Sequence, residues 1–551
     1  MFKFLVAFVL SSLPFAATTA CSQARPAVPA AQTPPPLAAP TPQGPRPRLV
    51  VLITVDQLRP DYLERWRPQF TGGYKMLMDE GHVFALAVHD HAITETAPGH
   101  ASTLSGRFPY STGIASNSAG VNTPEAPLVD SDGVGASPFR FLGTTLVDWM
   151  TAADPTTRVL SVARKDRGAI LPVGRSKGDV YWYAQRSGKF TTSTYYRDTL
   201  PTWVQAFNAE DHAGSRYAGT KWNLLLSESE YPEADSVLQE SGGQGIAFPH
   251  TLNVDAEMAR NQIVGYPWMD QMTLDVAWRG VRAMELGARD GHTDVLAVSL
   301  STTDAIGHRW GPDSRELHDQ VLRVDRMLGV FLDSLFNLRG RENVVIALTA
   351  DHGVAPIPGV RSTWGENQGA SRLNMRDFAR AIAAWAPVLQ RFDIPPEAIA
   401  LDWPVLEVDR RLVVGKEDGL REAAQAFARE AVQIPGIARV DLVEDLMRAD
   451  TSRDVIARRW LHMFRPGGNA LAVVTISPFW YFGSGTASHG TPHDYDARVP
   501  VTFWGAAFSP AIDSTTARVV DIAPTFAHLL GITPSEQLDG VVLSRAFKRT
   551  P

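Results

Sequence analysis

Residues 48–56, RLVVLITVD, form an apolar and largely β-branched run that ends in a carboxylate. Such a run predicts a strand buried on both faces, as in parallel sheets. Three more runs have this character: 294–304 (DVLAVSLSTTD), 343–351 (NVVIALTAD) and 498–505 (RVPVTFWG). Residues 320–336, between two of them, carry apolar side chains at helical spacing. Strands alternating with helices predict an α/β fold with a central, mostly parallel sheet flanked by helices.

The N-terminus has the composition of an export signal. Residues 1–20 carry one lysine, a short apolar stretch and then small residues, which predicts a signal peptide and an exported protein, periplasmic or secreted. Residues 21–46 are rich in proline and alanine and predict an extended tether. Cys21, the only cysteine, is either a bystander near the cleavage point or the carrier of a lipid anchor. Thr18 stands where the lipoprotein motif usually has leucine.

The rest of the chain has an ordinary soluble composition. A net charge of -7 among 551 residues, without a Lys/Arg-rich run, argues against nucleic-acid binding, and no later apolar run is long enough to predict a transmembrane helix. Residues 47–551 are expected to form one large domain with two insertions. The first, about 178–270, is aromatic and turn-rich, and its aromatic side chains either pack as a lid or contact substrate. The second, about 358–485, has its own helices and strands and predicts a small α+β cap. The sequence does not indicate an oligomeric state.

Polar residues follow the predicted strands where open α/β sheets place their sites. Asp56 ends the first strand, and Asp304 and His308 lie four residues apart after another, so that a helical turn would bring both to one side. Asp351 and His352 are neighbours at a third strand end. Carboxylates and imidazoles gathered at one sheet edge are the ligands of a zinc-type metal centre.

The segment 488–500, SHGTPHDYDARVP, adds a further candidate ligand, either His489 or His493, before another strand. With His489, six candidate ligands with mixed oxygen and nitrogen donors result. Six are too many for one tetrahedral zinc ion, and they suit two ions.

Thr96 lies in the stretch ITETAPGH, where Pro98 and Gly99 predict a turn that opens a helix. A hydroxyl near a helix N-terminus lies beside unsatisfied N–H groups that favour an anion. Thr96 is therefore either the cap of this helix or a group that meets an anionic substrate.

Several motifs together resemble the alkaline phosphatase superfamily. They are VDQLRPDYLERW, TETAPGHASTLSG followed by GIASN, ARKDRGAI, STTDAIGH, TADHG, HGTPHDYDARVP, DIAPTFAHLLGI and LDGVVL, spaced in the expected order over about residues 48–545. The chain looks most like the bacterial alkaline phosphatases of the phosphate-irrepressible type, which use threonine as the nucleophile.

The resemblance assigns roles by position. It implies two zinc ions, one held by Asp304, His308 and His489, the other by Asp56, Asp351 and His352 beside the Thr96 oxygen. It also implies phosphoryl contacts from three further residues: Asn117, Lys165 and Arg167.

The activity implied is that of a zinc-dependent hydrolase of small-molecule phosphate monoesters, acting through a phosphothreonine intermediate. Two cations and an amide around the phosphoryl group favour a monoester dianion over a diester. Two alternatives stay open: a phosphodiesterase or nucleotide pyrophosphatase of the same superfamily, and an exported metal- or phosphate-binding protein without turnover. A sulfatase is disfavoured because no CxPSR-like motif is present.

Overall fold

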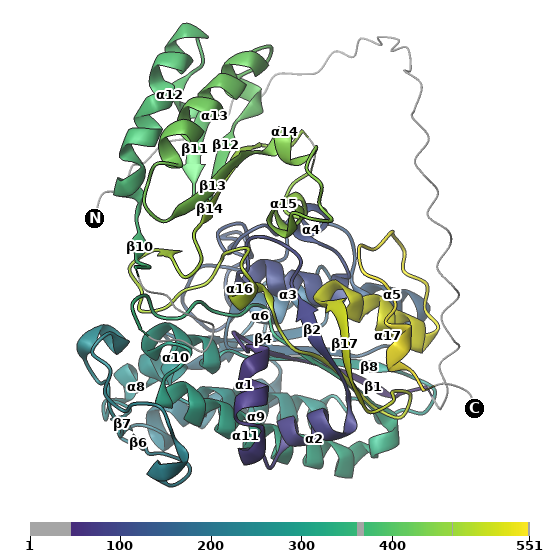
Figure 1. Ribbon diagram of the computed structural model, residues 1–551. Coiled ribbons are helices and arrows are strands. Elements are labelled where there is room, and N and C mark those ends of the chain that lie inside the picture. The colour runs from purple at the N-terminus through teal and green to yellow at the C-terminus, as the bar shows by residue number, and fades with distance from the viewer. Residues whose placement is uncertain (1–45, 361–368, 466, 549–551) are drawn as a thin grey trace. The chain divides into compact units, whose positions relative to one another are not determined.

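The computed structural model describes residues 46–360, 369–465 and 467–548 (Figure 1). The predicted signal peptide, Cys21 and the tether up to residue 45 lie outside the described residues. The fold is built around a nine-stranded sheet. In spatial order its strands are β17 (Ala511–Arg518), β2 (His82–Val88), β16 (Val501–Trp504), β9 (Val344–Thr349), β1 (Leu49–Val55), β8 (Asp294–Leu300), β3 (Val159–Ala163), β4 (Asp179–Ala184) and β5 (Lys189–Thr191).

The apolar runs of the sequence form the middle of this sheet. β1 pairs in parallel with β8 on one side and β9 on the other, and every residue of these three strands is buried. Parallel pairing continues from β8 to β3 and β4, whereas β5 and β16 run antiparallel to their neighbours. The sheet is therefore mostly parallel, as the sequence predicts.

Register brings the ends of the central strands to one edge. Val55 of β1 lies opposite Leu300 of β8, and Thr54 lies opposite Thr349 of β9. The residues that follow these positions consequently emerge together at the carboxyl edge of the sheet.

Helices lie on both sides of the sheet, with α2, α9 and α11 along one side and α3, α5 and α17 along the other (Figure 1). The helices outside the second insertion are α1 (Pro60–Arg65), α2 (Gly73–Glu80), α3 (Thr96–Ser105), α4 (Pro109–Thr112), α5 (Leu146–Ala153), α6 (Asp166–Ile170), α7 (Thr202–Ala209), α8 (Ala256–Gln262), α9 (Trp268–Ala283), α10 (Thr302–Trp310), α11 (Arg315–Arg339), α16 (Asp494–Ala497) and α17 (Ile522–Leu530). None of the described helices has the length and apolar character needed to cross a membrane.

The second insertion folds around its own sheet and apolar core. Its strands are antiparallel and stand in the order β11 (Ile399–Asp402), β12 (Val405–Val408), β14 (Ala470–Ile476) and β13 (Ile437–Leu442). Its helices are α12 (Ala379–Arg391), α13 (Glu417–Ala431), α14 (Val443–Leu446) and α15 (Val455–Leu461). The first and last strands of the insertion, β10 (Arg372–Leu373) and β15 (Tyr481–Phe482), pair with each other in parallel and form a separate two-stranded sheet. We call residues 369–485 the cap.

The first predicted insertion is less separate from the main sheet than the cap is. Its opening residues form β4 and β5, which extend the main sheet, and only later residues form the small pair β6 (Lys221–Trp222) and β7 (His250–Thr251). Its aromatic side chains pack against one another, as in the edge-to-face pair Tyr181 and Trp203, whose ring centroids are 5.3 Å apart. This geometry favours the packing role over substrate contact.

Candidate active site

The strand-end residues gather as the sheet topology requires. Asp56 directly follows β1, and Asp351 and His352 follow β9 after one alanine. Asp304 and His308 lie on α10, which begins two residues after β8. A four-residue spacing on a helix puts both side chains on one face, so α10 presents them together.

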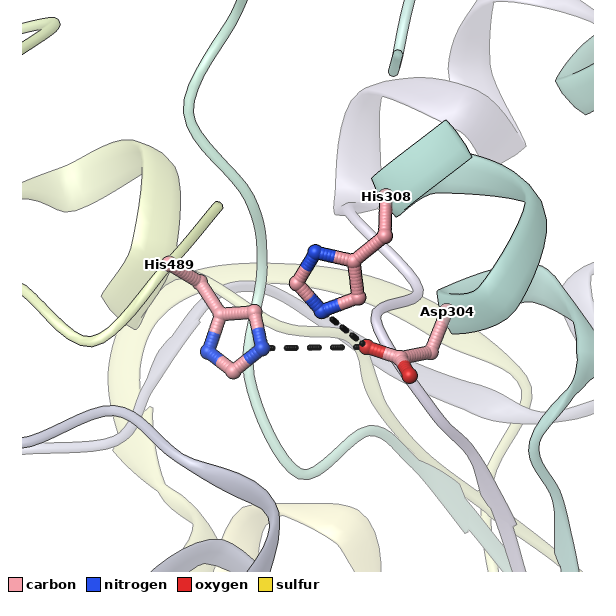
Figure 2. A group of neighbouring side chains, drawn as sticks. All are labelled: Asp304, His308 and His489. Atoms are coloured by element: carbon pink, nitrogen blue, oxygen red, sulfur yellow. Dashed lines mark ion pairs between the residues drawn. The ribbon is translucent and has the colours of Figure 1, made fainter. Parts of the chain in front are cut away.

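A first group of candidate ligands consists of Asp304, His308 and His489. Figure 2 shows both imidazoles directed at the same carboxylate oxygen. The Nε2 atoms of His308 and His489 lie 3.2 Å and 3.7 Å from Oδ1 of Asp304. This is the set that the resemblance assigned to one ion.

A second group consists of Asp56, Asp304 and His352, so Asp304 belongs to both groups. The expected second set had Asp351 in this place. Asp351 lies beside the group, with Oδ2 3.4 Å from Nε2 of His352, and the same nitrogen is 3.4 Å from Oδ1 of Asp56. The structure thus brings all the expected ligands together, with Asp304 within reach of both groups, and the division of the six ligands between two ions stays a prediction.

Hydrogen bonds place one hydrogen on each of the three histidines. Because a carbonyl can only accept, Nδ1 of each ring carries a hydrogen, and Nε2 is the atom that a neutral ring can offer to a metal. The three bonds, each 2.8 Å long, join His308 to the carbonyl of Ala487, His352 to that of Gly353 and His489 to that of Thr94. Burial lowers the pKa of His352 and of His489, which favours the neutral form that binds metal. Burial acts in the same direction on His308, but the charge of Asp304 outweighs it and raises the pKa of His308.

Three buried carboxylates crowd the same space. Burial and the charges of Asp304 and Asp351 raise the pKa of Asp56. Burial works against ionisation of Asp304 too, but Lys165 and His308 hold its pKa well below the usual range. Two basic side chains reach this cluster. Nζ of Lys165 lies 2.5 Å from Oδ2 of Asp56 and 2.7 Å from Oδ2 of Asp304, and the Arg164 guanidinium lies 4.0 Å from Oδ2 of Asp304.

The donor set fits divalent metal ions. Neither oxygen of Asp56 accepts a hydrogen bond of normal geometry, even though Lys165 is close, and Oδ2 of Asp351 also lacks one. Unsatisfied buried carboxylate oxygens are costly without a cation. Together with the Nε2 atoms of the three histidines, they form a mixed oxygen and nitrogen environment of the kind that zinc and related metals prefer.

Thr96 is the first residue of α3 and is almost fully buried. Its hydroxyl oxygen lies 3.1 Å from Nζ of Lys165 and 3.4 Å from Nε2 of His352. The helix can come this close because residue 99 is glycine: a Cβ there would lie 2.1 Å from the carbonyl oxygen of Asp351. The TAPG sequence thus positions a hydroxyl beside the second group of candidate ligands.

The three residues predicted to contact the phosphoryl group differ in how close they lie to Thr96. Asn117 lies against the start of α3, where its Oδ1 accepts from the N–H of Ala97 at 2.9 Å. Lys165 is in direct contact with Thr96, as described above. Arg167, on α6, forms an ion pair with Asp166 at 3.6 Å, and its charge partly offsets the burial that raises the pKa of Glu95.

His489, and not His493, belongs to the metal-ligand group. Nε2 of His493 is instead hydrogen-bonded to the carbonyl of Ile476 in the cap. The segment that carries His489 is anchored by Asp496, whose Oδ2 accepts from both the N–H and the hydroxyl of Thr491, at 2.9 Å and 2.6 Å.

Three supporting residues were not predicted from the sequence. Gln57 joins two candidate ligands: its N–H donates to Asp351 at 3.1 Å and its Nε2 donates to Asp304 at 3.0 Å. Glu95 accepts the N–H of Asn117 at 2.6 Å. His100 donates from Nδ1 to the Thr96 carbonyl and approaches Oδ2 of Asp351 at 3.3 Å. The only sequence signal for these three residues was their position next to residues of the motifs: Gln57 follows Asp56, Glu95 precedes Thr96 and His100 follows Gly99.

Comparisons with known proteins place the chain in a family. Residues 50–425 match the profile described as "Type I phosphodiesterase / nucleotide pyrophosphatase". The chain therefore belongs to this family.

Similarity to particular members extends over nearly the whole chain. "Alkaline phosphatase PhoV" of Synechococcus elongatus is 31% identical over 91% of this chain and 93% of its own. "Alkaline phosphatase PafA" of Elizabethkingia meningoseptica is 30% identical over 89% of this chain and 92% of its own. "Alkaline phosphatase PhoK" of a Sphingomonas species is 30% identical over 90% of each chain.

A crystal structure of PafA matches with a TM-score of 0.82 at 27% identity, covering 92% of this chain and all of that one. The resemblance to the alkaline phosphatase superfamily and the expected fold are thereby confirmed.

Proposed function

We propose that this protein is a phosphate monoester hydrolase of the alkaline phosphatase type that works with two zinc ions and with Thr96 as its nucleophile. Full-length relatives named alkaline phosphatase support the reaction class. The observation that carries the site assignment is the position of the Thr96 hydroxyl, 3.1 Å from an ammonium group and 3.4 Å from Nε2 of the candidate ligand His352.

The chain's own residues account for the steps of such a reaction. The Thr96 oxygen bonds to phosphorus while the bond from phosphorus to the ester oxygen breaks, and the hydroxyl proton is recovered on the departing alcohol. Water then releases phosphate from the phosphothreonine and restores the hydroxyl. Lys165 and the N-terminus of α3 place positive charge where the phosphoryl oxygens gain negative charge. Two bound metal ions would supply Lewis-acid charge to the attacking and leaving oxygens.

Selectivity for monoesters follows from charge around the phosphoryl group. A monoester dianion has three terminal oxygens, and Asn117, Lys165 and Arg167 offer donors for them, with Glu95 holding Asn117 in place. A diester has one negative charge fewer and needs room for a second substituent.

A phosphodiesterase is the second candidate, because the family profile that matches residues 50–425 is described by that activity. The two functions predict opposite ratios of activity on p-nitrophenyl phosphate and bis-p-nitrophenyl phosphate. The proposal expects a higher kcat/KM on the monoester, and a higher value on the diester would replace it with the second candidate.

The nucleophile is tested by Thr96→Ala, with Thr103→Ala as the matched control. Both threonines are buried in α3, but the hydroxyl of Thr103 donates to the carbonyl of His100 at 2.7 Å, away from the candidate ligands. We expect Thr96→Ala to lower kcat by roughly 10³-fold or more and to abolish the labelled phosphoenzyme, while Thr103→Ala keeps both. Near wild-type turnover in Thr96→Ala would exclude the nucleophile role and require another catalytic mechanism, whereas metal-loaded wild-type protein without any turnover would favour a binding protein.

The metal requirement is tested separately. Chelation should remove activity and lower the melting temperature, because metal bound to the folded state stabilises it, and added zinc should restore both. Restoration by another divalent ion but not by zinc would contradict the proposed metal identity.

We also propose that the protein is exported, to the periplasm or beyond, on the basis of residues 1–20 alone. Cell fractionation and the mass of the mature N-terminus test this. A mass that includes lipid on Cys21 identifies an anchor, and retention of residues 1–20 contradicts export by a cleaved signal.

A further inference from the structure

A cavity of about 330 Å³ lies between the first group of candidate ligands and the cap. His308, His489 and Asn117 line it on the side of the main domain. Trp403 and Phe482 line it on the side of the cap. It is therefore bounded by polar groups suited to a phosphate ester at one end and by aromatic rings at the other.

The aromatic end is a preformed wall. The rings of Trp403 and Phe482 are stacked, with centroids 4.3 Å apart and an angle of 13° between their planes. Fully buried Phe378 supports the pair from behind, 5.2 Å from the Trp403 ring. Both wall residues are half-buried and both line the cavity, which places them where a ligand in it can contact them.

The position of the cavity defines which part of a substrate can enter it. His308 and His489 of the first group line it, whereas Asp56, Asp351 and His352 do not. In the proposed reaction the attacking Thr96 oxygen lies 3.4 Å from Nε2 of His352, a member of the second group, so the first group is assigned to the leaving oxygen. The substituent of the ester oxygen, and not the phosphoryl group, is accordingly the part that faces Trp403 and Phe482.

We propose that Trp403 and Phe482 bind the leaving group, and that the preferred substrates are phosphate monoesters whose alcohol carries an aromatic ring. The proposal rests on the proposed phosphatase function. An aromatic ring stacks on another with a favourable energy that a saturated chain of similar polarity does not gain. A cavity of this size is at the lower end of small-molecule sites and suits one ring system.

The test compares benzyl phosphate with ethyl phosphate, because both release an alkyl alcohol and differ mainly in the ring. We expect Trp403→Ala to lower kcat/KM for benzyl phosphate about tenfold and to change that for ethyl phosphate less than about twofold. Trp403→Phe, which keeps a ring, should retain most of the preference. Benzylphosphonate should likewise lose affinity as a competitive inhibitor in Trp403→Ala, whereas methylphosphonate should not.

Trp385→Ala is the matched control. Trp385 belongs to the same apolar core of the cap, where it packs on Phe427, but it does not line the cavity. A general weakening of the cap would affect this variant too and would lower activity on both esters alike.

The outcomes separate this inference from the function on which it rests. Equal losses on both esters in Trp403→Ala, or the same benzyl-selective loss in Trp385→Ala, overturn the leaving-group assignment while the phosphatase activity stands. Wild-type protein that is loaded with zinc and hydrolyses neither ester overturns both.

Discussion

Gln57 is predicted to control metal affinity without being a ligand. Its side-chain Nε2 donates to Oδ1 of Asp304, the oxygen toward which His308 and His489 also point. Its main-chain N–H donates to Asp351 from a backbone with φ of 67°, in the left-handed region. One fully buried residue thus orients two of the three carboxylates.

The size of the effect follows from the kind of bond that is lost. Gln57→Leu removes the donor to Asp304 but keeps the main-chain bond to Asp351, and leucine and glutamine tolerate the left-handed backbone about equally because neither branches at Cβ. A hydrogen bond to a charged group contributes about 1.5–3 kcal/mol. At about 1.4 kcal/mol per tenfold change, zinc should bind roughly 10- to 100-fold more weakly.

The assay is a zinc titration of chelator-treated protein against a competing chromophoric chelator, so turnover is not needed. Gln320→Leu is the matched control, because Gln320 is equally buried and donates to the buried carboxylate of Asp270 at 2.9 Å, outside both ligand groups. It should leave zinc affinity within about twofold of the wild type, since only bonds to the ligands tune the metal. Wild-type zinc affinity in Gln57→Leu, or an equal loss in the control, would refute the orienting role.

Two further predictions concern charge. Lys165→Ala and Arg167→Ala should each lower kcat/KM for the monoester, by about 100-fold for Lys165, and should lower kcat/KM for the diester far less. Steady-state kinetics on p-nitrophenyl phosphate and bis-p-nitrophenyl phosphate measure both values. Equal losses on the two substrates would contradict monoester selection by charge. Burial raises the pKa of Asp496 to about 7, so the folded protein binds this proton more tightly than the unfolded chain and loses stability as pH rises from about 4 to 7. Asp496→Asn should therefore show a smaller fall in unfolding free energy over that range in urea titrations, and an unchanged or steeper fall would contradict it.

Local patterns in the sequence predicted much of the sheet and several site residues. The run before Asp56 forms β1, and the four-residue spacing of Asp304 and His308 matches their position on α10. These features depend on neighbours in the chain, and therefore periodicity reveals them. The helix start at Thr96 was equally visible, because proline and glycine follow it at once.

Features that depend on distant contacts were not predictable in this way. Asp304 is shared by two ligand groups because α10 and the end of β1 meet in space, which spacing along the chain does not encode. The left-handed backbone of Gln57 has no sequence signal of its own. Likewise, Trp403 and Phe482 are 79 positions apart in the sequence, and only the fold of the cap stacks them.

The cap is inserted between two ligand-bearing segments, after His352 at the end of β9 and before His489. Each of these histidines is held by the main domain, through the carbonyls of Gly353 and Thr94. The length and sequence of the intervening cap can therefore diverge without moving His352 or His489. In such an arrangement, evolution or an engineer can exchange the cap while the candidate metal ligands keep their supports in the main domain.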